Sequence, residues 1–290
     1  VKYIVKFKIR GEKMNKKILL VNDMPGYGKV ALSAMTPILS TMGHSLFNLP
    51  TALVSNTLDY GKFEIMDTTE YMEKSLQIWE ELNFSFDCIS TGFIFTKRQV
   101  ELILQYIEKK KTQGIFVMVD PIMGDQGKLY NGVKEETVDN MRKLSSVADV
   151  MVPNFTEACF LARKYVGQKT ISLEEVKDLI QLLLSNGAKS IVITSIETED
   201  NQHYVCGFDS KTQDYFFLPY DHIPIQFPGT GDIFSSILLG NLLHEYSLTE
   251  SVQKAMNVVY EFILKNKDNQ DKFRGIAIEE GLSLIKYVMR

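Results

Sequence analysis

The sequence predicts an α/β protein in which a central, mostly parallel sheet is flanked by helices on both faces. Short apolar runs rich in Val and Ile alternate with longer segments in which apolar residues recur at helical spacing. Polar residues follow several of the apolar runs, and ligands of such sheets bind outside the carboxyl ends of the strands. The 290 residues, 45% of them hydrophobic, are enough to bury a large core.

Composition excludes several classes of protein. The formal net charge is only −4, so we expect neither a nucleic-acid partner nor a disordered acidic tail. The three cysteines are far apart and odd in number, which argues against a disulfide framework and favours a reducing cytoplasm. No run of 18 apolar residues is available to cross a membrane, and no signal peptide is visible.

We expect a single domain over residues 14–290, preceded by a foreign leader over residues 1–13. Met14 opens a good buried strand and is the expected natural start, which makes the upstream piece an artificial or misassigned extension. The alternation of apolar and basic residues over positions 1–10 leaves an edge strand as the alternative.

Strands and helices alternate from Met14 onward. We expect strands over residues 18–21, 51–54, 87–90, 115–119, 148–152 and 191–195, a hairpin over 204–208 and 215–218, and helices over 30–42, 69–82, 97–108, 173–185, 250–264 and 279–289. Residues 22–28 are expected to form a loop at the ligand-binding edge. This loop is not a Walker A motif, because it lacks the four-residue gap and the Ser or Thr after Lys29.

The chain is organised around residues 228–232, Pro-Gly-Thr-Gly-Asp, which precede a long apolar helix. Gly229 and Gly231 on either side of Thr230 allow a sharp turn that exposes backbone N–H groups at a helix N-terminus, where an anion binds well. Asp232 would act as a general base that takes the proton of a substrate hydroxyl during phosphoryl transfer. The alternative is an ordinary turn in which Asp232 caps the helix.

Two further acidic segments follow strands. Asp120 and Asp125 lie after the strongest predicted strand, around a Pro and a Gly, and suit a divalent cation that bridges phosphates. A solvated acidic turn is the alternative. After the next strand, Asn154 and Glu157 open a helix, where Asn154 would be its cap and Glu157 an acid favoured by the helix dipole.

Taken in order, four motifs resemble the ribokinase superfamily: Asp-Pro-Ile-Met-Gly-Asp at 120–125, Pro-Asn-Phe-Thr-Glu at 153–157, Val-Ile-Thr-Ser at 192–195 and Pro-Gly-Thr-Gly-Asp at 228–232. Within it the chain resembles the pyridoxal and pyridoxamine kinases from Met14 to its end. The first motif with residues 127–130, together with Ser55-Asn56 and residues 91–93, points to this vitamin B6 branch.

The resemblance implies an ATP-dependent, cytoplasmic kinase that phosphorylates the 5′-hydroxymethyl group of a B6 vitamer and forms a homodimer. It implies Mg²⁺ as the metal, with a monovalent cation as a further candidate. It implies Asp232 as base, with Gly229, Thr230 and Gly231 as the anion hole. It implies the remaining roles as follows: metal ligands Asp120, Asp125 and Glu157; nucleotide and cation contacts Asp120, Asp125, Asn154, Glu157, Thr194 and Ser195; and substrate contacts Asn22, Asp23, Ser55, Asn56 and Asp232.

The chain departs from the family pattern at three places. Asn22-Asp23 replaces the usual Ser-His, Ser55-Asn56-Thr57-Leu58 replaces Ser-Asn-His-Thr, and Val152 replaces a Thr that is a possible ligand for a monovalent cation. A hydroxymethylpyrimidine kinase of thiamine synthesis therefore stays open as an alternative. A sugar or nucleoside kinase, a nucleotide-dependent lyase on the same fold, and a non-catalytic binding protein are the weaker alternatives.

Overall fold

The sheet is the centre of the structure, a computed structural model that describes residues 15–130 and 133–288. The expected leader, residues 1–13, lies outside the described residues. Nine strands form the sheet, in the order β11-β10-β9-β8-β5-β4-β1-β2-β3, and β6 and β7 form a separate hairpin. The strands are β1 (Lys17–Tyr27), β2 (Ser45–Asn56), β3 (Ile65–Asp67), β4 (Cys88–Thr91), β5 (Phe116–Val119), β6 (Gly124–Asp125), β7 (Lys128–Leu129), β8 (Val150–Met151), β9 (Ser190–Glu197), β10 (His203–Asp209) and β11 (Asp214–Tyr220).

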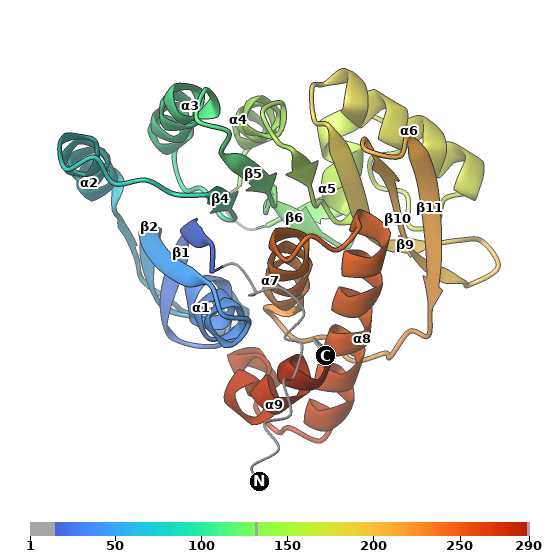
Figure 1. Ribbon diagram of the computed structural model, residues 1–290. Helices are drawn as coiled ribbons and strands as arrows, with labels where there is room; N and C mark the ends of the chain where they lie inside the picture. The colour runs from blue at the N-terminus through green and yellow to red at the C-terminus, as the bar shows by residue number, and fades with distance from the viewer. Residues whose placement is uncertain (1–14, 131–132, 289–290) are drawn as a thin grey trace, which may run out of the picture.

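Helices cover both faces of the sheet, so the predicted fold class is confirmed (Figure 1). One face carries α2 (Thr69–Glu81), α3 (Lys97–Lys111), α4 (Glu135–Ser145), α5 (Phe155–Ala162) and α6 (Leu173–Ser185). The other face carries α1 (Ala31–Thr41), α7 (Thr230–Leu243), α8 (Leu248–Asn266) and α9 (Ile278–Val288). Each face has its own apolar core. None of the described helices is long and apolar enough to span a lipid bilayer.

Six neighbouring strands, β2, β1, β4, β5, β8 and β9, are parallel. Their carboxyl ends therefore meet at one edge of the sheet, which we call the carboxyl edge, and their first residues meet at the opposite, amino edge. Antiparallel strands complete the sheet on both sides, β3 beside β2 and the β10–β11 hairpin beside β9.

The loop expected over residues 22–28 is not observed, because most of these residues belong to a strand. Strand β1 continues to Tyr27, and it pairs with β2 along its whole length through a shift in register between Asn22 and Met24. The glycine-rich sequence suggested a break, but the ladder with β2 supplies hydrogen bonds that keep the chain extended. The short strand β3, helix α4 and the β6–β7 hairpin were not predicted.

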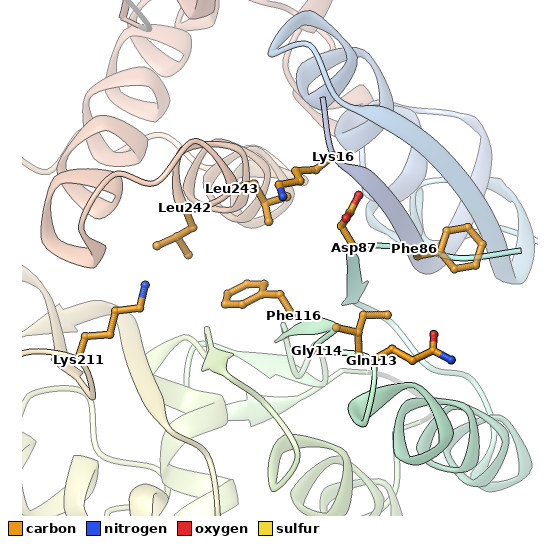
Figure 2. A pocket seen from close by; sticks show the side chains of 10 residues that line it. Lys16, Phe86, Asp87, Gln113, Gly114, Phe116, Lys211, Leu242 and Leu243 are labelled. Atoms are coloured by element: carbon orange, nitrogen blue, oxygen red, sulfur yellow. The ribbon is translucent and has the colours of Figure 1, made fainter. Parts of the chain in front are cut away.

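The amino edge contains two features outside the candidate site. One is a cavity of about 270 Å³ between the first residues of the sheet and the end of α7 (Figure 2). The other is a pair of histidine rings, His44 and His244, with centroids 4.6 Å apart. The Nδ1 atom of His44 accepts a hydrogen bond from the Lys16 backbone, and Nε2 lies 3.3 Å from the Gly240 carbonyl oxygen. These contacts fit a neutral ring with its proton on Nε2.

We expect His44 to make the protein less stable in acid. Burial, reinforced by His244, lowers the pKa of His44 to about 4 in the folded state, against about 6.5 in an unfolded chain. The folded state thus binds fewer protons, and stability is lost as the pH falls from about 6.5 towards 4. Relative to a His44→Gln variant, the wild type should lose about 1–2 kcal/mol of unfolding free energy between pH 7 and pH 4.5, after allowance for solvent screening.

Urea denaturation of both proteins at several pH values measures this difference. The variant removes the titrating ring and keeps a polar side chain, so other titrating groups cancel in the comparison. A difference that stays constant with pH would contradict the assignment.

Candidate active site

The predicted anion-binding turn lies at the start of α7, on the carboxyl edge. Gly229 precedes the helix with φ +85°, a conformation that favours glycine, and no side chain caps this helix. Its ideal Cβ position would be 2.4 Å from the Lys29 carbonyl oxygen, so only glycine fits. An added Cβ on Gly231, by contrast, would meet no atom within 4 Å. The space beside Gly231 in the first turn of α7 is therefore open, which leaves room for an anion at this helix N-terminus.

Asp232 lies in this first turn and is only 8% exposed. Its Oδ2 atom accepts a hydrogen bond from the Ala31 backbone N–H at 2.8 Å, and Oδ1 accepts one from Asn22 Nδ2 at 3.2 Å. Burial raises the pKa of Asp232 to about 6, and these two hydrogen bonds oppose the shift. The carboxyl group is thus held in a fixed position with a pKa close to neutrality, which suits a general base.

Asn22 connects β1 to two other elements of the site. Its Oδ1 atom accepts hydrogen bonds from the backbone N–H groups of Phe93, at 2.8 Å, and Asp23, at 3.0 Å, while its Nδ2 donates to Asp232. A Cβ on Gly92 would lie 2.4 Å from Asn22 Nδ2, so the glycine leaves room for this amide. The side chain that was predicted to contact substrate is almost completely buried and orients Asp232.

Two more aspartate side chains near Asp232, those of Asp120 and Asp23, have pKa values that are raised towards neutrality. Burial raises the pKa of Asp120 to about 7; the Ser235 hydroxyl, which donates to Oδ2 at 2.8 Å, opposes the shift and Asp232 adds to it. Burial and then the charge of Asp232 raise the pKa of Asp23 to about 7. Asp23 and Asp120 therefore each lie close enough to Asp232 for its charge to raise their pKa values.

Asn154 caps α5, as predicted, and together with Glu157 it forms a capping box. Asn154 Oδ1 accepts from the Glu157 N–H, and Glu157 Oε2 accepts from the Asn154 N–H, both at 2.9 Å. Glu157 Oε1 also accepts from the Met123 N–H at 3.0 Å. Burial, then the charge of Asp120, raises the pKa of Glu157 well above its ordinary value. Both residues thus hold the segment after β5 in place.

Tyr130 lies within electrostatic range of all four predicted acids. Its pKa is raised first by burial and then by the charges of Glu157, Asp125, Asp120 and Asp232. Asp125, in the β6–β7 hairpin, is the exposed member of this group, and Tyr130 follows the hairpin. Tyr130 was noted in the sequence only as part of a family motif. Its closeness to these acids arises from tertiary contacts, so the sequence alone could not predict it.

The acids do not form a complete metal site by themselves. Among the described residues, no group of three or more His, Cys, Asp or Glu side chains could hold a metal ion. Mg²⁺ is commonly bound through one or two carboxylates, waters and substrate phosphates, so the exposed Asp125 and half-buried Asp120 fit such a shared site. Glu157 already accepts backbone hydrogen bonds on both oxygens. The metal roles of Asp120, Asp125 and Glu157 stay predictions.

The remaining predicted residues lie in the carboxyl-terminal halves of β9 and β2, on the same side of the sheet. Thr194 forms a parallel bridge with Asn154, and Ser195 follows it, exposed and with φ +59°. Across the sheet, Ser55 and Asn56 end β2 and line a cavity of about 350 Å³. The Ser55 hydroxyl donates to Asn56 Oδ1 at 2.7 Å. The residues predicted for the nucleotide side and those predicted for the substrate side thus lie along the same edge. Their roles stay predictions.

A C-terminal segment that was not predicted to belong to the site contacts residues in and beside this cavity. Tyr27 and Tyr60 also line it, and the Tyr60 hydroxyl donates to both carboxylate oxygens of Asp271, at 2.6 and 2.7 Å. The Thr57 hydroxyl donates to the Phe273 carbonyl oxygen at 2.6 Å.

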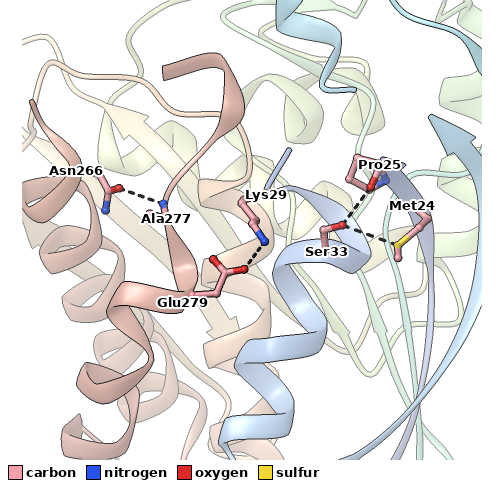
Figure 3. A network of polar contacts seen from close by, with 7 residues as sticks. All are labelled: Met24, Pro25, Lys29, Ser33, Asn266, Ala277 and Glu279. Carbon is pink, nitrogen blue, oxygen red and sulfur yellow. Dashed lines mark hydrogen bonds and ion pairs between the residues drawn. The ribbon is translucent and has the colours of Figure 1, made fainter. Parts of the chain in front are cut away.

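The same segment is fixed to the loop between β1 and α1 (Figure 3). The Lys29 ammonium pairs with Glu279, and the Lys29 N–H donates to the Arg274 carbonyl oxygen at 2.8 Å. Nearby, the Ser33 hydroxyl donates to the Pro25 carbonyl oxygen at 3.3 Å.

A parallel α/β sheet with a glycine turn and an aspartate at the start of a buried helix, beside further acids at the carboxyl edge, defines the ribokinase-like class of kinases. The family model described as phosphomethylpyrimidine kinase matches residues 39–275. The chain therefore belongs to the ribokinase-like family of phosphomethylpyrimidine and pyridoxal kinases.

Known relatives carry both names. A pyridoxal kinase of Arabidopsis thaliana is 30% identical over 223 residues, which are 72% of this chain and 68% of the relative. The hydroxymethylpyrimidine/phosphomethylpyrimidine kinase of Aquifex aeolicus is 28% identical over 187 residues, or 64% and 70% of the two chains. A crystal structure of a Bacteroides thetaiotaomicron protein, assigned by inference as a phosphomethylpyrimidine kinase and crystallised with pyridoxal, has a TM-score of 0.89 and 32% identity and covers 94% and 96% of the two chains.

The two glycines of the turn should respond differently to the same substitution. Gly229→Ala forces a side chain into a positive φ and against the Lys29 carbonyl oxygen, so we expect a loss of about 1–3 kcal/mol of stability. Gly231→Ala has room for its methyl group and gains helix propensity, so stability should be unchanged or higher by up to about 1 kcal/mol.

The methyl group of Gly231→Ala would nevertheless fill part of the open space beside this helix N-terminus, and the KM for a nucleoside triphosphate should rise. Thermal unfolding and steady-state kinetics of the two variants measure both effects. An unchanged KM in Gly231→Ala would show that this space does not receive the anion.

Proposed function

We propose that this protein transfers the γ-phosphoryl group of ATP to the 5′-hydroxymethyl group of a vitamin B6 vitamer. The observation that carries the proposal is the buried Asp232 carboxyl group, held by Ala31 and Asn22 beside the open N-terminal turn of α7. A hydroxyl that approaches this carboxylate can lose its proton as its oxygen attacks phosphorus. The N–H groups around Gly231 stabilise the charge on the transferred group.

The other predicted residues take supporting roles in this mechanism. Asp120 and Asp125 would hold Mg²⁺ through its waters and the ATP phosphates, and the ion would neutralise charge on the phosphoryl group. Thr194 and Ser195 would line the nucleotide side. Glu157, through the capping box with Asn154, would keep the segment after β5 in register with the phosphates.

The B6 substrate is supported by the relatives and by the cavity at the end of β2. The Bacteroides protein that was crystallised with pyridoxal shares nearly the whole length of this chain. The cavity lined by Ser55, Asn56, Tyr27 and Tyr60 offers hydroxyl, amide and aromatic groups to a hydroxylated pyridine ring. The expected homodimer stays a prediction, which sedimentation equilibrium would check.

A hydroxymethylpyrimidine kinase is the second candidate. The matching family model and the Aquifex relative carry this name. Asn22-Asp23 in place of Ser-His also departs from the pyridoxal kinase pattern. Both substrates present a hydroxymethyl group on a nitrogen heterocycle, so the same base and anion turn would serve either.

Replacement of Asp232 by Asn should abolish transfer while the protein stays folded. The amide cannot accept the hydroxyl proton, so we expect kcat to fall by about 10²–10⁴-fold. In the wild type, kcat/KM should fall as the pH decreases through about 6, because protonated Asp232 is no longer a base. The control is Asp214→Asn, which makes the same charge change on the exposed start of β11. Near-normal turnover of Asp232→Asn would refute the proposed base.

A substrate panel separates the two candidate functions. ATP consumption and product formation are measured with pyridoxal, pyridoxine, pyridoxamine and hydroxymethylpyrimidine. We expect the highest kcat/KM for one of the three B6 vitamers. A higher kcat/KM for hydroxymethylpyrimidine would overturn the B6 proposal in favour of the second candidate, and no transfer to any alcohol would contradict both.

A further inference from the structure

A second cavity lies at the amino edge of the sheet, opposite to the edge that carries Asp232. It is formed where β1, β4 and β5 begin, beside the β10–β11 turn and the C-terminal end of α7. Its volume is about 270 Å³. None of the residues discussed above as candidates for the kinase reaction lines it. Its lining residues are Lys16, Phe86, Asp87, Gln113, Gly114, Ile115, Phe116, Lys211, Leu242 and Leu243.

Two lysines give this cavity a positive charge. Figure 2 shows the amino groups of Lys16 and Lys211 directed from opposite sides towards the space around the Phe116 ring. In the described part of the chain, neither ammonium group has a hydrogen-bond or ion-pair partner. Lys189, near the same edge, is by contrast paired with Asp149 at 2.7 Å. Two unpaired ammonium groups that face one cavity favour an anion with several acceptor oxygens.

The acidic residue of the cavity is already engaged. Asp87 Oδ2 accepts a hydrogen bond from the Lys17 backbone N–H at 2.7 Å. This contact directs the carboxylate to the start of β1 rather than to either lysine. With two lysines and one aspartate, the lining keeps a formal charge of about +1 at neutral pH.

The rest of the lining is apolar and includes an aromatic ring. Phe116, Leu242 and Leu243 are half-buried and pack against the core between the sheet and α7. Figure 2 shows the Phe116 ring between the two lysines, with both leucines on the α7 side. A planar ring could therefore stack on Phe116 and cover the leucines. The cavity is smaller than the roughly 300–1,000 Å³ of sites for drug-sized ligands, which limits the ligand to a single small ring.

We propose that this cavity binds a small aromatic phosphate monoester. The phosphate lies between Lys16 and Lys211, and the ring packs against Phe116, Leu242 and Leu243. Phosphate oxygens accept hydrogen bonds from both ammonium groups, and a dianion matches their combined charge. The proposal does not depend on the proposed function, because the cavity and Asp232 lie at opposite edges of the sheet.

Calorimetric titration with phenyl phosphate tests the proposal. The titration is made in the presence of a non-hydrolysable ATP analogue, so that the anion turn at Gly229 is occupied. We expect the wild type to bind phenyl phosphate and Lys16→Ala/Lys211→Ala to bind it at least tenfold more weakly. The control Lys17→Ala/Lys265→Ala removes two ammonium groups outside the cavity lining and should bind like the wild type. Inorganic phosphate should bind the wild type at least tenfold more weakly than phenyl phosphate, because it lacks the ring.

A second variant tests the apolar half of the cavity. Phe116→Ala keeps both lysines, and we expect it to reduce the preference for phenyl phosphate over inorganic phosphate at least threefold, with thermal unfolding as the check on its fold. Absence of binding to the wild type, or equal binding to the wild type and Lys16→Ala/Lys211→Ala, would overturn the proposal. Equal affinity for inorganic phosphate and phenyl phosphate would also overturn it. These titrations involve no turnover, so their failure is separate from a failure of the proposed kinase activity.

Discussion

The burial of the Asp232 carboxyl group is the constraint on which the candidate site depends. A buried carboxylate is costly unless it is hydrogen-bonded, and its two partners here come from the start of α1 and from β1. Satisfying Asp232 therefore fixes α1, α7 and the middle of β1 relative to one another. Gly229 is part of the same constraint, because its backbone approaches the Lys29 carbonyl oxygen more closely than any side chain would allow.

The crowding of acids at the carboxyl edge has no benefit for folding. Asp23, Asp120 and Glu157 each have a raised pKa, partly because another carboxylate lies nearby. Such repulsion destabilises the folded state, and it is usually kept only where function needs it. A cation shared with phosphates would relieve the repulsion and favour the ionised forms. The electrostatics thus agree with a site that handles a metal-bound polyphosphate.

Local signals predicted most of the fold and much of the site, because both depend on strand ends and helix starts. The helix start after Gly229, the acids after β5 and the capping box of α5 could be read from neighbouring residues. Helix α4 could also have been found, since Val138, Met141 and Leu144 recur at helical spacing. Contacts between distant segments could not be predicted. Tyr60 and Asp271 are 211 residues apart, and the continuation of β1 to Tyr27 depends on its pairing with β2.

Helix α7 connects the two edges of the sheet, and its sequence reflects both. Its 14 residues span about 21 Å. Every residue from Asp232 to Asn241 is buried, and apolar residues lie on every side of the helix. A helix packed in this way has no exposed face along its middle, so groups that meet a ligand from solvent lie at its two ends. The N-terminal end carries Asp232 and the open turn at Gly231. The C-terminal end presents Leu242 and Leu243 to the amino-edge cavity. Tight packing of α7 against α1 and α8 thus holds the base at one end of the helix and the two leucines at the other in fixed positions.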